Sequence, residues 1–209
     1  MSELVDQFCP NSHDAAISAL CWDPETGSRA SADTSGRVAI TRRGESAPGL
    51  VFQPGGPIRG AITMLRGGSL IAVGDDHGNV GVYKTSREEA IFRELREPSE
   101  GAVRAMRAMA LSPNGAKLAS LAIDGLIRLW DLESGTRINA WQGFGGRSLS
   151  FDQKGDRLLC LTSEGHPCLV DLLSRVSRPM DKLQSPAHTA HFTRDNTHVV
   201  CAGASGISL

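Results

Sequence analysis

Three metal-ligating side chains, Cys160, His166 and Cys168, surround one short polar segment, Ser163–Gly165. Thiolate and imidazole groups are ligands of Zn²⁺, so metal binding is the first chemistry to consider. On the two strands of a hairpin, Cys160 and Cys168 would face each other at about 5 Å. A zinc site would also need a fourth ligand in tetrahedral geometry. We therefore predict two buried cysteines that behave as small apolar residues, with no metal and no cofactor.

Catalytic motifs are missing from the sequence. It has no GxSxG, HExxH or P-loop pattern, and no GxGxxG followed by a helix. The glycine-rich run at 143–146 reads as a loop. We predict that the chain is not an enzyme.

The net charge and the lack of targeting signals limit which partners and which cellular compartment the sequence predicts. With 22 Lys+Arg against 23 Asp+Glu, the net charge is −1, whereas proteins held to nucleic acid or anionic lipid are usually strongly basic. We find no apolar run of 18 residues and no secretory signal. Five cysteines, an odd number without CxxC spacing, favour free thiols. We predict a cytoplasmic protein that does not bind membranes, and nucleic acid is a disfavoured partner.

A repeat of about 40 residues runs along the chain. Five polar turns end in a glycine, and these glycines are 42, 47, 40 and 41 residues apart, at positions 36, 78, 125, 165 and 206. Glycine suits such turns because a tight hairpin needs a positive φ. An apolar strand precedes each turn and an alternating strand follows it, as in Leu126–Trp130.

The repeat predicts an all-β fold. Four antiparallel strands per period of roughly 40–45 residues are typical of a β-propeller blade. The stretch Ser86–Arg96 looks helical but fits a loop and an outer strand better. We predict a single domain over residues 1–209 with about five blades, at approximately 13–55, 56–98, 99–143, 144–184 and, incomplete, 185–209.

The third unit resembles the WD-repeat propellers. It carries the family's Ser120, Asp124-Gly125 and Trp130-Asp131 at the family's spacing, after a fitting turn at Ser112–Gly115. The resemblance implies a structural hydrogen-bond network of His, Ser, Asp and Trp inside a blade. It therefore implies structural roles for Ser120, Asp124 and Trp130, and not a catalytic acid at Asp124.

The first unit matches the His and Ser positions of the family's pattern. His13 lies 18 residues before Ser31, a separation that the family uses, so both residues are predicted to be structural. Ser35 stands where the family has Asp, and Thr41 stands where it has Trp.

Basic residues recur at the start of successive inner strands. When these strands are aligned on their ends, Arg107, Arg147 and His188 occupy one position, near the predicted channel mouth. Arginine binds carboxylates and phosphates through paired hydrogen bonds. We predict that these residues bind a partner. The alternative is that they pair with acids of the chain such as Glu100 or Glu164.

The resemblance implies a non-catalytic scaffold that binds a partner protein or peptide at loops around the channel mouth. If the basic residues make the contact, the partner is expected to be acidic. Two other classes stay open: an enzyme or cofactor-bearing propeller with its site in the channel, and a nucleic-acid-associated subunit that uses an arginine patch.

The last unit lacks an outer strand from its own end. The segment Glu3–Phe8 could supply that strand and close a five-bladed ring. Alternatively, the chain is part of a seven-bladed ring, and its end blades would then associate through uncovered edges and apolar faces. We favour the incomplete seven-bladed ring.

Overall fold

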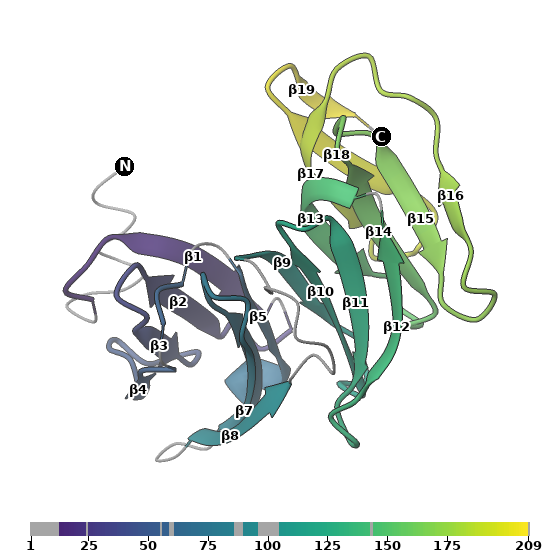
Figure 1. Cartoon of the computed structure of the whole chain (residues 1–209). Helices are drawn as coiled ribbons and strands as arrows, with labels where there is room; N and C mark the ends of the chain where they lie inside the picture. Colours follow the sequence, from purple (N-terminus) through teal and green to yellow (C-terminus); the bar gives the residue numbers. More distant parts are fainter. Residues whose placement is uncertain are drawn as a thin grey trace. The chain divides into compact units, whose positions relative to one another are not determined.

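The computed structural model describes residues 13–23, 25–54, 56–58, 61–85, 90–95, 105–142 and 144–208. The chain divides into two compact units, Met1–Met106 and Arg107–Leu209. The described residues form five antiparallel sheets, which we number as blades in chain order. Figure 1 shows them in colours that run from purple to yellow.

The first unit holds two four-stranded blades, each with its strands adjacent in chain order. The first blade consists of β1 (Ile17–Trp22), β2 (Arg29–Asp33), β3 (Val38–Thr41) and β4 (Leu50–Phe52). The second consists of β5 (Ala61–Leu65), β6 (Leu70–Gly74), β7 (Val80–Thr85) and β8 (Ala90–Leu95), with the 3₁₀ turn η1 (Arg66–Gly68) between β5 and β6.

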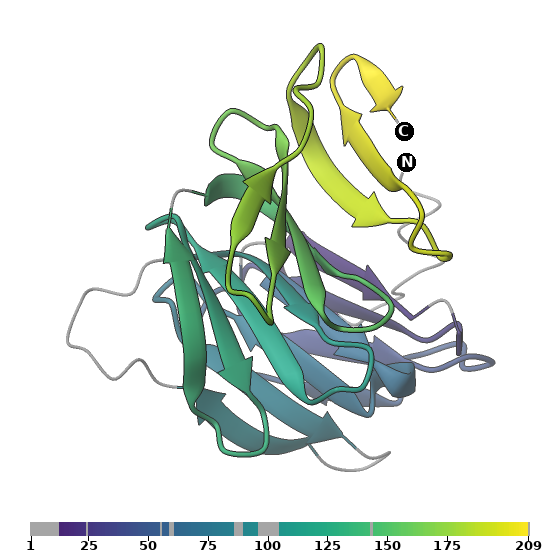
Figure 2. The ribbon, with the colours of Figure 1, turned by 90° about the vertical axis from the view of Figure 1, so that its right-hand side faces the viewer.

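The second unit holds the other three blades apart from Met106, the first residue of β9, and the last of these blades has three described strands (Figure 2, yellow). The third blade consists of β9 (Met106–Leu111), β10 (Lys117–Ala122), β11 (Leu126–Asp131) and β12 (Arg137–Gln142). The fourth consists of β13 (Phe144–Phe151), β14 (Arg157–Thr162), β15 (Pro167–Asp171) and β16 (Ser177–Pro179). The fifth consists of β17 (Ala187–Phe192), β18 (Val199–Gly203) and β19 (Gly206–Ser208).

The repeat glycines form the turns between the second and third strands of the blades. All five have positive φ, between 77° and 121°. At Gly125, an added Cβ would lie 2.8 Å from the carbonyl oxygen of Phe144, so the turn also requires a small residue where the next blade begins. The spacing that predicted the turns therefore reflects both a backbone conformation and a close approach.

The cores lie between neighbouring blades of each unit. In the first unit, residues of β2 and β3 such as Ala30 and Ile40 pack against Ile62 and Met64 of β5. In the second unit, Leu121 and Ile127 of the third blade pack against Leu149 of the fourth. These cores consist of alternate residues of each strand, because a strand has two faces.

The predicted fold class is confirmed: the chain is all-β, with five propeller blades of mostly four antiparallel strands. The stretch that looked helical contains β8, and residues 86–89 and 96 lie outside the described residues. The prediction of a single domain stays a prediction, and Glu3–Phe8 lies outside the described part of the chain. No helix among the described residues is long and apolar enough to cross a bilayer.

Candidate functional site

Two of the three predicted binding residues line one open depression in the second unit. It has a volume of about 480 Å³ and lies where the inner strands β13 and β17 begin, beside the turn between β14 and β15. Its lining comprises Gly145, Gly146, Arg147, Thr162, Ser163, Glu164, Gly165, Pro186, Ala187 and His188. We call it the Arg147 depression.

Irregular strand pairing positions these two residues. In β17, Ala187 pairs with Gly203 and Thr189 pairs with Ala202, so His188 is an extra residue in the ladder. In β13, the residues between Phe144 and Leu149 lie opposite a single residue of β14. Such bulges bend a strand and redirect its side chains, and they are frequent next to binding sites.

The two glycines before Arg147 let β13 approach β14 closely. A Cβ on Gly145 would lie 2.8 Å from the Cα of Ser163, and one on Gly146 would lie 2.5 Å from the Cβ of Leu161. Since real Cβ atoms do not approach this closely, larger residues would force the strands apart. The run at 143–146, predicted as a loop, therefore belongs to β13 from residue 144 onward.

The third predicted binding residue, Arg107, has a different environment. Its Nη1 donates a hydrogen bond to the carbonyl oxygen of Gly145 at 2.7 Å, and its side chain is half-buried. The guanidinium thus ties β9 to the irregular start of β13. It supports the wall of the Arg147 depression and does not line it.

Arg147 and His188 are exposed, and neither side chain forms a hydrogen bond or ion pair within the described part of the chain. The acid that could have paired with Arg147, Glu164, lines the same depression with a largely exposed side chain, and its Oε2 lies 3.9 Å from Nε2 of His166. Glu100 lies outside the described residues. An unpaired guanidinium beside an imidazole can receive a carboxylate or a phosphate.

The interior of the third blade holds two separate polar pairs. The indole N–H of Trp130 donates to Oγ of Ser120 at 2.9 Å, and both residues are buried. The carboxylate of Asp124 instead accepts hydrogen bonds from Arg128, at 2.7 and 3.2 Å, and from the N–H of Leu126. The structure therefore joins Ser120 to Trp130 and places Asp124 in a structural ion pair that the sequence did not suggest.

Residues 93–131, which end with this blade's third strand, match the family model of the WD domain, G-beta repeat. This segment is a WD40 repeat. WD40 propellers are typically protein-interaction scaffolds and are generally non-catalytic. A comparison with curated proteins gives no match.

The first blade, outside the matched WD40 segment, has a different network around His13. Its Nδ1 donates to Oδ2 of Asp33 at 2.8 Å, and its Nε2 lies 2.7 Å from Oγ of Ser31. The sequence predicted roles for His13 and Ser31 but missed Asp33, because the aligned WD40 position is Ser35. The available signal was an Asp-x-x-Gly turn at 33–36, two residues after Ser31.

Asp33 is the acceptor that organises this network. Burial alone would raise the pKa of Asp33, but hydrogen bonds from Ser35, His13 and the N–H of Arg37 hold that pKa below its usual value. Ser35, which stands at the family's Asp position, donates both its N–H and its hydroxyl to this carboxylate. The carboxylate of this network therefore belongs to Asp33, two residues before the position at which the WD40 pattern has its Asp.

The two cysteines of the fourth blade form a buried pair. Cys160 and Cys168 are opposite each other in the β14–β15 ladder, and both are buried and unoxidised. Hydrogen bonding with Cys168 and burial raise the pKa of Cys160. No group of three or more metal-ligating side chains occurs among the described residues. A raised thiol pKa disfavours a reactive thiolate at Cys160, whereas the hydrogen bond with Cys160 lowers the pKa of Cys168.

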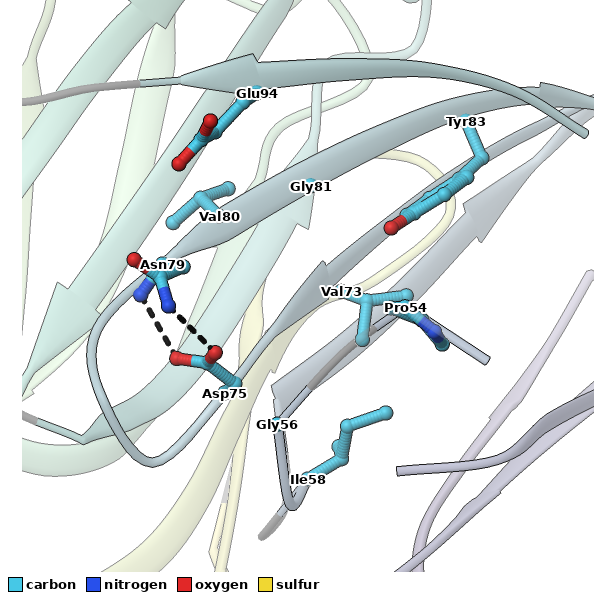
Figure 3. A pocket seen from close by; sticks show the side chains of 10 residues that line it. All are labelled: Pro54, Gly56, Ile58, Val73, Asp75, Asn79, Val80, Gly81, Tyr83 and Glu94. Carbon is cyan, nitrogen blue, oxygen red and sulfur yellow. Dashed lines mark hydrogen bonds between the residues drawn. The ribbon is translucent and has the colours of Figure 1, made fainter. Parts of the chain in front are cut away.

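A second pocket of about 260 Å³ lies in the first unit, and no sequence motif pointed to it (Figure 3). Ile58, Val73 and the ring of Tyr83 form apolar walls, with Asp75 and Glu94 as acids at the lining. Burial, and then these two carboxylates, raise the pKa of Tyr83 to about 12. Two hydrogen bonds from Asn79 already occupy the Asp75 carboxylate.

Proposed function

We propose that the chain is a non-catalytic, cytoplasmic scaffold that binds an acidic segment of a partner protein in the Arg147 depression. One observation carries the proposal: the bulges of β13 and β17 bring Arg147 and His188 into one depression, with no partner for either among the described residues. The WD40 repeat supports the general role of a protein-interaction scaffold.

The chemistry of the lining suits a carboxylate-bearing peptide. Arg147 can donate two parallel hydrogen bonds to a carboxylate. Ser163 and Leu161 of the neighbouring strand fill the space where side chains of Gly145 and Gly146 would lie, so both residues present only backbone to the depression. Glu164 lines the same depression and would repel a second acid, so we expect one anchored carboxylate and not an extended polyanion.

The test measures, by fluorescence anisotropy, binding of a labelled glycine-rich peptide with a single glutamate to the full chain. We expect Arg147→Ala with His188→Ala to weaken binding by about 1.5–3 kcal/mol, the range for hydrogen bonds to charged groups. Glu164→Gln should strengthen binding, because it removes the like charge from the lining. Arg107 is kept intact, since its hydrogen bond to Gly145 supports the wall.

Arg194→Ala is the matched control. Arg194 is also exposed and lies in the same unit, in the turn after β17, outside the depression. It should bind the peptide like the unaltered chain. If Arg194→Ala and the double variant weaken binding equally, or neither does, the depression is not the acidic-peptide site.

A further inference from the structure

Two apolar side chains of the inner strand β1 are largely exposed: Leu20 at 61% and Trp22 at 64%. Their neighbours Ala19 and Cys21 pack into the core that the first blade shares with Ile62 of the second. Because successive residues of a strand point to opposite faces, Leu20 and Trp22 lie on the face turned away from the second blade. We call this the outer face of the first blade.

The same strand positions are buried in other blades. Ile62 and Met64 of β5 are each 8% exposed, and they pack on the preceding blade of the first unit. Leu149 and Phe151 of β13 are 6% and 8% exposed, and they pack on the preceding blade of the second unit. In the second and fourth blades, the face equivalent to the outer face of the first blade is therefore covered by the preceding blade.

The fifth blade has an uncovered face of the complementary kind. Its Ala190 and Cys201 pack with Leu161 of the fourth blade, so the opposite face carries Ala202 and Ile207, which pair across β18 and β19. Ile207 is 75% exposed. In the fourth blade, the corresponding side of β14 receives the inner strand of the next blade. We call this the outer face of the fifth blade.

We propose that the chain self-associates head to tail, the outer face of the first blade of one copy packing on the outer face of the fifth blade of a second copy. Each described blade-to-blade contact within a unit joins these two kinds of face, and the first and fifth blades expose one face each. Trp22 would be the central anchor, as large aromatic residues commonly are at protein interfaces. A contact between two unlike faces is heterologous and can extend into a chain of copies. A copy with one blocked face therefore ends such a chain on the side of that face.

The test uses the full chain in sedimentation velocity over a range of concentrations. We expect the unaltered chain to increase in average mass with concentration. Leu20→Asp and Ile207→Lys should each abolish this increase, because each places a charge in one of the two faces. Leu173→Asp is the control: Leu173 is 93% exposed in the turn after β15 and belongs to neither face, so this variant should associate normally.

Mixing the two blocked variants separates this arrangement from a symmetric one. Leu20→Asp keeps an intact fifth blade and Ile207→Lys keeps an intact first blade, so their mixture should form a dimer of one copy of each and nothing larger. Equal urea midpoints would show that both variants fold. A monomeric unaltered chain, an associating Ile207→Lys variant, or a mixture that stays monomeric would each overturn the proposal.

Discussion

The first and third blades stabilise the same part of a blade with different polar groups. In the third blade, a buried Ser120 accepts the indole N–H of Trp130. In the first, Ser31 lies beside His13, which also bonds to the fully buried Asp33. Each blade thus has one part of the family's His–Ser–Asp–Trp network. The comparison indicates that the Ser position is common to both arrangements and that the groups around it can be exchanged.

The largest effect should come from the third blade. Trp130→Ala removes a side chain that is 1% exposed together with its hydrogen bond to Ser120. We expect a loss of about 3–5 kcal/mol in the free energy of unfolding, as for other buried aromatic truncations. Urea denaturation measures it. An unchanged midpoint would mean that this blade does not depend on its indole, and the comparison with the first blade would fail.

The second effect should come from the charge in the first blade. Asp33→Asn weakens the hydrogen bonds from His13, Ser35 and Arg37, and we expect it to cost about 3 kcal/mol at pH 7, the upper range for bonds to a charged group.

The pH dependence of this destabilisation tests whether the Asp33 carboxylate is its source. The folded state lowers the pKa of Asp33, so its stabilisation is complete above the unfolded pKa of about 3.9 and is lost as pH falls through the lower folded value. The difference in unfolding free energy between the unaltered chain and Asp33→Asn should therefore shrink as the pH falls below about 3.9. A difference that grew on acidification would contradict the role of Asp33.

Local features of the fold could be predicted from the sequence, and the polar partners could be predicted only in part. Strand alternation and turn glycines act over a few residues, so the blades follow from spacing. The structural roles of Ser120 and Trp130 were implied by the resemblance to the WD-repeat propellers. Asp33 was missed because a carboxylate two residues from its family position can still reach His13. The bond of Arg107 to Gly145 depends on how β13 bulges, which no spacing encodes.

The smallest effects should come from the Ser position that the two blades share. Ser120→Ala leaves the Trp130 N–H buried without an acceptor, and we expect a cost of about 2 kcal/mol. Ser31→Ala leaves His13 with its bond to Asp33, so we expect only about 1 kcal/mol. Urea midpoints of both variants give the comparison directly.

A double-mutant cycle tests the reason for this difference. In a Trp130→Phe background there is no indole N–H to leave unpaired, so Ser120→Ala should become nearly neutral. If Ser120→Ala costs the same in that background as in the unaltered chain, the hydroxyl is needed for packing and not for the indole. If Ser31→Ala proves the more destabilising of the two, His13 depends on its hydroxyl partner more than on its carboxylate. The first blade would then rely on the shared Ser position more strongly than the third.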